Sequence, residues 1–132
     1  MIDVQLNEPS AAREYFAKRL AFTTGPVELD RMIQERHNVV IIDVREEKDF
    51  QQGHIPGAIN LPKSRWHTRD GLRWNAMNII YCYSSTCHLA ARAAHDFASS
   101  GYAVMEMEGG FEAWQENNLE VEKPSTTSFR HG

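Results

Sequence analysis

Two cysteines five positions apart, Cys82 and Cys87, are the side chains best suited to nucleophilic chemistry in this sequence. Cys82 ends the apolar segment NIIYC, residues 78–82, which reads as a buried strand, and a helix is expected to start near Cys87. Backbone N–H groups at a helix start have no partner inside the helix, and the helix dipole adds positive charge there. Both effects favour a thiolate, so we predict that the pKa of Cys82 is lowered toward neutrality. The same loop would hold an anionic substrate.

A purely structural role is the alternative for Cys82, because a free cysteine often behaves as a small buried hydrophobic residue. The residues around Cys82 do not decide between these two roles. Two neighbouring cysteines are too few and too close together to form a disulfide framework, so the role of the pair must be local.

Strands and helices alternate along the chain. The predicted strands are residues 38–44, 58–61, 78–82 and 102–107. The predicted helices are residues 10–20, 26–36, 88–100 and 111–118. Their boundaries are marked by Ser10 as the cap of the first, Pro26 in the first turn of the second, Gly101 after the third, and the turn at Gly109 and Gly110 before the fourth. This order predicts an α/β fold with right-handed crossovers and a parallel or mostly parallel sheet. Ligands of such sheets collect at the carboxyl ends of the strands, where Cys82 stands.

Composition narrows the class of protein. The chain has 132 residues, 42% of them hydrophobic, which is enough for one core and one domain. A formal charge of −4, with no basic stripe, argues against nucleic-acid binding. The first ten residues carry acids where a signal peptide needs basic residues, and no apolar run follows them. We therefore expect neither export nor membrane binding, and a cytoplasmic location.

Several motifs occur in a specific order between residues 39 and 122: DVR at 43–45, GHIPGAINLP at 53–62, the strand that ends in Cys82, and GGFEAW at 109–114. In this order and spacing the chain resembles the rhodanese family of sulfurtransferases. The resemblance implies a three-layer domain, with a mostly parallel central sheet flanked by helices on both faces. We assign residues 25–122 to that domain, residues 1–24 to a helical extension packed on it, and residues 123–132 to a flexible tail.

The same resemblance implies a reaction. Cys82 matches the family's cysteine, which takes a sulfane sulfur from a donor such as thiosulfate, becomes a persulfide and passes the sulfur to a thiol or cyanide. The partners implied are a small sulfur donor and a small or protein thiol, with no cofactor. The family cradles the persulfide with the amides of the five following residues, which in this chain are Tyr83, Ser84, Ser85, Thr86 and Cys87. Many members have a glycine and a basic residue in this loop, often an arginine where this chain has Cys87, so anion binding would rest on amides, hydroxyls and His88.

Cys87 has two possible roles. It is either a residue at the helix start that faces the core, or a resolving thiol that attacks the inner sulfur of a Cys82 persulfide and releases sulfide.

Three functions compete. The first is a sulfurtransferase, and the second is a non-catalytic or redox- or reactive-sulfur-sensing module that uses both cysteines, which a raised pKa at Cys82 would favour. A Cys82 side chain sealed from solvent, or one that titrates like an ordinary thiol, would count against the enzyme and leave only a description of the fold. The third is a phosphatase, since the cell-cycle phosphatases share this fold, but His88 stands where they have an arginine that grips phosphate.

Other polar residues are expected to support the site. Asp43 and Arg45 end the first buried strand and are expected to pair and hold the neighbouring loop. The histidines do not predict a metal site. His54 is interpreted as a turn residue. None of His54, His67, His88 and His95 is spaced from the cysteines as the ligands of a zinc site are, so we predict no metal. The connection between the second and third predicted strands carries three arginines interleaved with two tryptophans: Arg65, Arg69 and Arg73 with Trp66 and Trp74. The arginines either form a solvent-exposed face or extend over the site and supply positive charge there. The N-terminal helix packs on its own domain or forms a dimer contact, so we expect a monomer or a weak dimer.

Overall fold

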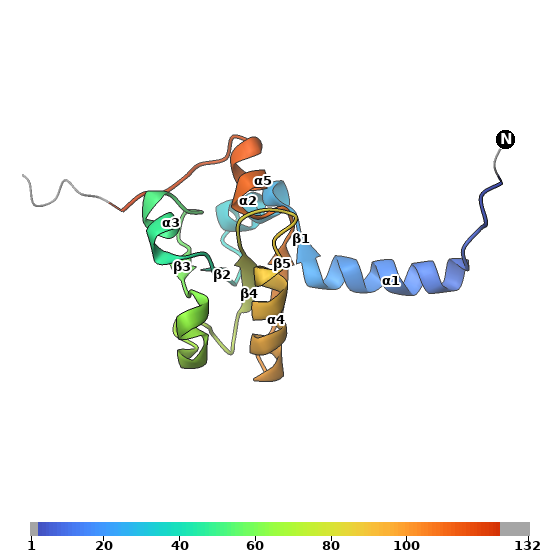
Figure 1. Ribbon diagram of the computed structural model, residues 1–132, viewed down its shortest axis with the longest axis horizontal. Helices are drawn as coiled ribbons and strands as arrows, with labels where there is room; N and C mark the ends of the chain where they lie inside the picture. The colour runs from blue at the N-terminus through green and yellow to red at the C-terminus, as the bar shows by residue number, and fades with distance from the viewer. Residues whose placement is uncertain (1–2, 125–132) are drawn as a thin grey trace, which may run out of the picture.

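The computed structural model describes residues 3–124. Its elements in chain order are α1 (Pro9–Phe22), β1 (Thr23–Thr24), α2 (Pro26–Gln34), β2 (Val39–Asp43), α3 (Glu47–Gln52), β3 (Ile59–Asn60), the 3₁₀ segment η1 (Lys63–Thr68), β4 (Met77–Tyr81), α4 (Leu89–Ser99), β5 (Val104–Met107) and α5 (Gly110–Glu116) (Figure 1). The strands and helices predicted from the sequence are present, with ends shifted by a few residues. Three short elements, β1, α3 and η1, were not predicted.

The five strands form one sheet in the order β1-β5-β4-β2-β3, and every neighbouring pair is parallel. The predicted parallel α/β fold is therefore confirmed. β2 and β4 are in register from Val39 opposite Met77 to Asp43 opposite Tyr81. Because the two strands end level with each other, the residues that follow them, Arg45 and Cys82, lie at the same edge of the sheet.

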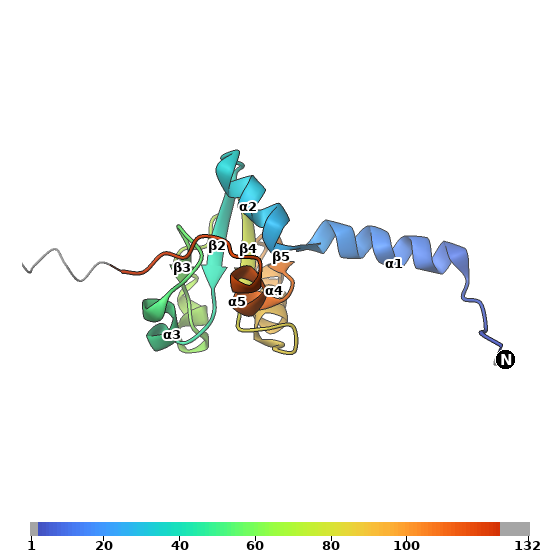
Figure 2. The ribbon, with the colours of Figure 1, turned by 90° about the horizontal axis from the view of Figure 1, so that it is seen from above.

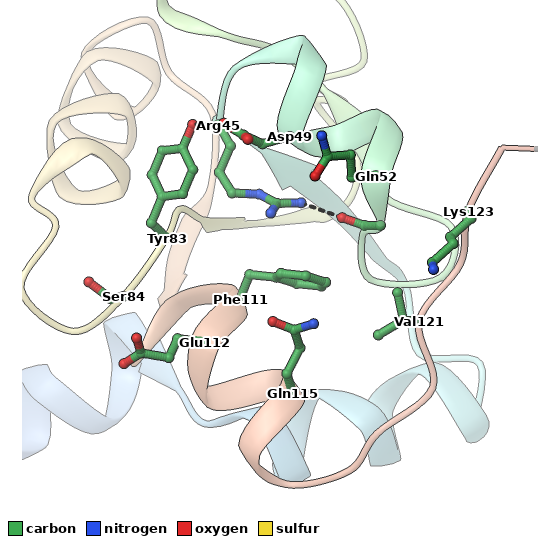
Figure 3. A pocket seen from close by; sticks show the side chains of 11 residues that line it. Arg45, Asp49, Gln52, Tyr83, Ser84, Phe111, Glu112, Gln115, Val121 and Lys123 are labelled. Carbon is green, nitrogen blue, oxygen red and sulfur yellow. Dashed lines mark hydrogen bonds between the residues drawn. The ribbon is translucent and has the colours of Figure 1, made fainter.

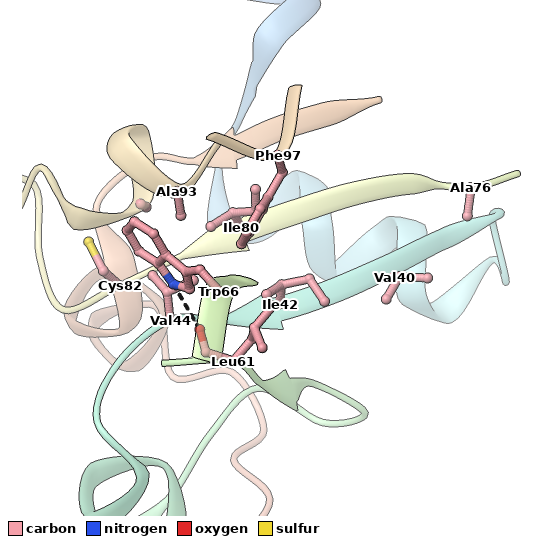
Figure 4. Close-up of a cluster of buried hydrophobic side chains, with 11 residues drawn as sticks. Val40, Ile42, Val44, Leu61, Trp66, Ala76, Ile80, Cys82, Ala93 and Phe97 are labelled. Atoms are coloured by element: carbon pink, nitrogen blue, oxygen red, sulfur yellow. Dashed lines mark hydrogen bonds between the residues drawn. The ribbon is translucent and has the colours of Figure 1, made fainter. Parts of the chain in front are cut away.

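Helices cover both faces of the sheet, which gives the three layers that the sequence predicted (Figure 2). Successive residues of a strand point to opposite faces, so Val40 and Ile42 join one core while Ile41 joins the other. The first core contains side chains from α4 and η1, including Phe97 and Trp66 (Figure 4). The second core contains residues of α2 and α5, among which Leu29 and Trp114 are fully buried.

The N-terminal helix does not pack over the domain as the sequence predicted. α1 extends away from the sheet in both ribbon views and has no buried residue (Figures 1 and 2). It is attached where β1 pairs with β5, and Arg19 forms an ion pair of 3.2 Å with Glu108. Ser10 is not the cap either, because the helix already begins at Pro9. An apolar pattern shows that a helix has a face to cover, but it does not show what covers that face.

None of the helices between residues 3 and 124 combines the length and the apolar character needed to cross a lipid bilayer. Of the predicted C-terminal tail, residues 125–132 lie outside the described residues. The expected monomer or weak dimer stays a prediction.

The exposure of α1 leads to a stability prediction. Deleting residues 1–22 should change the free energy of unfolding by less than about 1 kcal/mol, because surface changes away from buried groups cost little. Leu29→Ala, in the second core, should cost about 2–5 kcal/mol. Urea unfolding followed by circular dichroism measures both. A shortened chain that is as unstable as Leu29→Ala would show that α1 is part of the folded unit.

Candidate active site

Cys82 lies directly after β4 at the carboxyl edge of the sheet, and the loop of residues 83–88 connects it to α4 at Leu89. This is the strand-loop-helix position that the sequence predicted. The side chain of Cys82 points into the first core and is only 2% exposed. Figure 4 shows it beside Val44, Trp66 and Ala93. A donor in solvent therefore does not reach this sulfur in the structure.

The helix α5 holds the start of the loop through two backbone hydrogen bonds. The N–H of Phe111 donates to the carbonyl of Cys82 at 2.8 Å, and the N–H of Glu112 donates to the carbonyl of Tyr83 at 2.9 Å. The first N–H groups of a helix have no partner inside the helix, so these two are satisfied by the loop. The loop and α5 are thus one bonded unit, which the sequence did not indicate.

Gly110 allows this close approach. Its φ is +64°, and a Cβ added there would lie 2.5 Å from the backbone N of Ser84 and 2.8 Å from the carbonyl oxygen of Cys82. Both the conformation and the space exclude a larger residue at this position. The sequence signal was the pair of glycines before FEAW, which by itself predicted only a turn.

The far half of the loop turns back at its exposed tip. The N–H of Cys87 donates to the carbonyl of Ser84 at 3.1 Å, and the hydroxyls of Ser84 and Thr86 lie 3.1 Å apart. Ser85 and Thr86 are exposed, while Cys87 is half-buried. This half therefore presents hydroxyls and one thiol.

Tyr83 anchors the loop to a second element. Its hydroxyl donates to the carboxylate of Asp49 at 2.6 Å and accepts the N–H of Glu46 at 3.1 Å. Asp49 belongs to α3, so the start of the loop is held by α3 as well as by α5.

The sequence-based prediction of an acidic Cys82 is wrong. Burial, followed by a hydrogen bond with Cys87, raises the pKa of Cys82 to about 12, although the amides of Ala90 and Tyr83 act in the opposite direction. The Cys82 thiol donates to the carbonyl oxygen of Cys87 at 3.5 Å. Removing the sulfur from water disfavours its charged form more than the loop amides favour it.

Cys87 is the more acidic partner of the pair. Burial opposes ionisation of Cys87, but the hydrogen bond with Cys82 and the amides of Leu89 and Tyr83 outweigh it and lower the pKa of Cys87. The carboxylate of Glu106 acts weakly against this shift. Within the loop, the thiolate therefore forms first at the more exposed sulfur.

His88 occupies the N-cap of α4 and makes no side-chain hydrogen bond to the helix. It lies near Glu106, whose pKa is raised by burial and by the charge of Glu108. The loop itself has no lysine or arginine, and a carboxyl group is its neighbour. The positive charge available to hold a strongly anionic donor is thus small at this loop.

Asp43 and Arg45 form the buried ion pair that the sequence predicted. The guanidinium and the backbone N–H of Arg45 donate to the Asp43 carboxylate at 2.8–3.1 Å. Arg45 also donates to the carbonyl of Gly53 at 2.7 Å and lies over the ring of Phe111, 4.2 Å from its centroid. The hydroxyl of Tyr81, which sequence reasoning missed, donates to Asp43 at 2.6 Å. The pair connects β2, β4 and α5 beneath the loop and supports it.

A cavity of about 680 Å³ lies beside the start of the loop (Figure 3). Arg45, Tyr83, Ser84 and Phe111 contribute to its wall, together with residues of α3 and the C-terminal segment. Neither cysteine lines this cavity. It is therefore a hollow next to the thiols and not a chamber around them.

The arginines of the connection between β3 and β4 could either form a solvent-exposed face or extend over the site, and the structure does not place them over the site. Arg69 binds Asp96 of α4 at 2.7 Å, and Arg65 donates to the carbonyl of Asn60. Arg65, Arg69 and Arg73 do not line the cavity beside the loop. Trp66 is buried against Cys82 in the first core, whereas Trp74 is exposed and stacks on Tyr102. Trp66 is thus the residue of this segment that shields the sulfur.

His54 has the local role that the sequence indicated. Its Nδ1 lies 2.9 Å from the carbonyl oxygen of Phe50, and the two rings stack with centroids 3.7 Å apart. Among residues 3–124, no three side chains of histidine, cysteine, aspartate or glutamate are grouped so that they could hold a metal ion. The absence of a metal from the working protein stays a prediction.

Comparison with known proteins agrees with this architecture. The sequence profile of the rhodanese-like domain matches residues 25–117, so the chain belongs to the rhodanese-like domain family. The BH2092 protein of Bacillus halodurans has a similar structure, with a TM-score of 0.82 and 32% identity over 88% of this chain and 87% of that chain.

Relatives with the same domain have different names. An HTH-type transcriptional regulator of Mycobacterium tuberculosis is 31% identical over 68% of this chain, which spans only 40% of that protein's length. The thiosulfate sulfurtransferase GlpE of Shewanella oneidensis is 31% identical over 64% of this chain and 83% of its own length. The family is therefore shared by a sulfurtransferase and by a regulator.

The ion pair beneath the loop leads to a second prediction. Asp43→Ala should lower the free energy of unfolding by about 3–5 kcal/mol, because it leaves the guanidinium of Arg45 buried without its partner. Tyr81→Phe, which removes one hydroxyl from the same carboxylate, should cost about 1–3 kcal/mol. Chemical denaturation measures both. Normal stability of Asp43→Ala together with lost activity would mean that the carboxylate acts in the reaction.

The unequal thiols lead to a third prediction. At pH 7, iodoacetamide should modify Cys87 at least about tenfold faster than Cys82 in the folded chain. Labelling of Cys87 should decrease only when the pH falls through its lowered pKa, and labelling of Cys82 should begin only as the pH rises toward 12. Peptide mass spectrometry locates the label, and the urea-unfolded chain, in which both thiols should react alike, is the control. Faster modification of Cys82 would contradict this assignment of charge.

Proposed function

We propose that the protein is a sulfurtransferase that carries sulfane sulfur as a persulfide on Cys82, accepts it from a small thiosulfate-like donor and passes it to a thiol or cyanide. The proposal draws support from membership of the rhodanese-like family and from the similarity to a thiosulfate sulfurtransferase. It includes the cytoplasmic location expected from the sequence.

One observation of the site carries the proposal. The amides of Tyr83 and Ala90 are directed at the Cys82 sulfur at the start of α4, where the helix dipole also favours negative charge. A persulfide adds one sulfur about 2.05 Å beyond Sγ, and we expect the same amides to stabilise its negative charge. A persulfide is also a stronger acid than the thiol from which it forms. The loop therefore suits the product better than the resting thiol.

A second candidate function has its own support. The burial of Cys82 and its raised pKa favour a module in which Cys82 and Cys87 respond to oxidants or reactive sulfur without turnover. The similarity to a transcriptional regulator is compatible with such a role. The two functions differ in one measurable property, because only a sulfurtransferase passes sulfur on repeatedly.

The test is sulfur loading followed by turnover. Wild-type protein treated with thiosulfate should gain the mass of one sulfur atom and lose it on addition of cyanide or a thiol, with many equivalents of product per chain. Cys82→Ser should reduce turnover by about 100-fold or more, because the carrier is removed. Ser99→Ala, at the exposed end of α4, keeps both thiols and the whole loop, so it is the control and should retain turnover.

Other results would overturn the proposal. Loading that stops after one equivalent of product would favour the sensing module. No gain of sulfur from thiosulfate or from a low-molecular-weight persulfide would overturn the sulfurtransferase and leave a response to oxidants as the remaining candidate.

A further inference from the structure

We propose that Cys87 is the thiol that first accepts the sulfane sulfur and that the sulfur then moves to Cys82 inside the loop. This inference rests on the proposed function and assigns the order of its first two steps.

The first argument is access. The Cys82 side chain is 2% exposed and is covered by Trp66 and Val44. Cys87, at the other end of the loop, is half-buried at the margin of the same core and follows the exposed residues Ser85 and Thr86. Cys87 is thus the more accessible of the two thiols.

The second argument is that the loop cannot easily bring Cys82 to the surface. The carbonyls of Cys82 and Tyr83 are held by the N–H groups of Phe111 and Glu112. Gly110 lies against the same backbone so closely that there is no room for a Cβ. Turning Cys82 outward would break both hydrogen bonds and leave buried groups unpaired.

The third argument is protonation. Burial raises the pKa of Cys82, whereas hydrogen bonds lower the pKa of Cys87, so the negative charge forms more readily on Cys87. The thiolate is the nucleophile in exchange at sulfur, and in this loop the less buried thiol is also the one whose pKa is lowered. Access and charge therefore point to the same residue.

The steps balance in atoms and charge. The Cys87 thiolate attacks the outer sulfur of thiosulfate, the bond between the two thiosulfate sulfurs breaks, and sulfite leaves with the electron pair. The Cys82 proton then moves to the terminal sulfur of the Cys87 persulfide. The resulting Cys82 thiolate attacks that terminal sulfur, the bond to Cys87 breaks, and Cys87 leaves as a thiolate. The products are a Cys82 persulfide and the original Cys87 thiolate, with no oxidant or reductant required.

The two cysteines are in direct contact. The Cys82 thiol donates to the carbonyl oxygen of Cys87 at 3.5 Å. The amides of Tyr83 and Ala90 then face the sulfur once it is on Cys82. The transfer moves the persulfide from an accessible position to a protected one.

The experiment compares loading rates of Cys82→Ser and Cys87→Ser with those of the wild type and of Ser99→Ala, a control at the exposed end of α4 away from the loop. Each is mixed with thiosulfate or with glutathione persulfide, quenched with an alkylating agent and analysed by fragmentation mass spectrometry. Cys82→Ser should still take up one sulfur, on Cys87, within about threefold of the wild-type rate, and Cys87→Ser should load at least about tenfold more slowly. In the wild type, sulfur should appear on Cys87 before Cys82. Circular dichroism checks that the variants are folded, and Cys87→Ala replaces any serine variant that is not.

The experiment distinguishes failure of the proposed order, Cys87 before Cys82, from failure of the proposed sulfurtransferase function. Loading of Cys87→Ser at the wild-type rate, with no loading of Cys82→Ser, would overturn the order of Cys87 before Cys82 and leave the sulfurtransferase proposal standing. Release of sulfide with formation of a Cys82–Cys87 disulfide, before any sulfur is found on Cys82, would overturn the transfer to Cys82, because Cys82 would then have attacked the inner sulfur of the Cys87 persulfide. A wild type that takes sulfur from neither donor would overturn both proposals.

Discussion

The geometry of the site depends on the contact between the first turn of α5 and the start of the cysteine loop. Two N–H groups of α5 bind the carbonyls of Cys82 and Tyr83, and Gly110 lets the two backbones touch. Because these carbonyls are turned toward α5, the Cys82 side chain is turned toward the opposite core, under Trp66. A single helix end thus determines that one cysteine of the pair is hidden and leaves the other near solvent.

The electrostatics of the pair follow from that placement. A helix start favours a thiolate in front of it, and an apolar environment disfavours one, so the outcome depends on depth. At Cys82 the apolar environment dominates, whereas at Cys87, only half-buried, the hydrogen bonds dominate. Since the loop has no lysine or arginine, it supplies no positive side chain that would override this difference. The amide of Tyr83 favours the thiolate at both cysteines, and yet the two pKa values shift in opposite directions.

The sequence was a good guide to what depends on neighbouring residues. Runs of β-branched residues predicted β2 and β4, and the motif DVR predicted the pairing of Asp43 with Arg45. It was a poor guide to what depends on distant segments. The cover over Cys82 comes from Trp66, sixteen positions earlier, and the anchor of the loop comes from Phe111, nearly thirty positions later. The catalytic roles assigned to the loop residues stay predictions.

The two outer strands of the sheet, β1 and β3, are each only two residues long. An edge this short offers few free backbone groups on which a strand from another molecule could add, which is the usual first event in amyloid-like aggregation. The long apolar strands β2 and β4, which would be hazardous at an edge, are interior and have a neighbour on both sides. The strand order thereby protects a sheet rich in valine and isoleucine from polymerising.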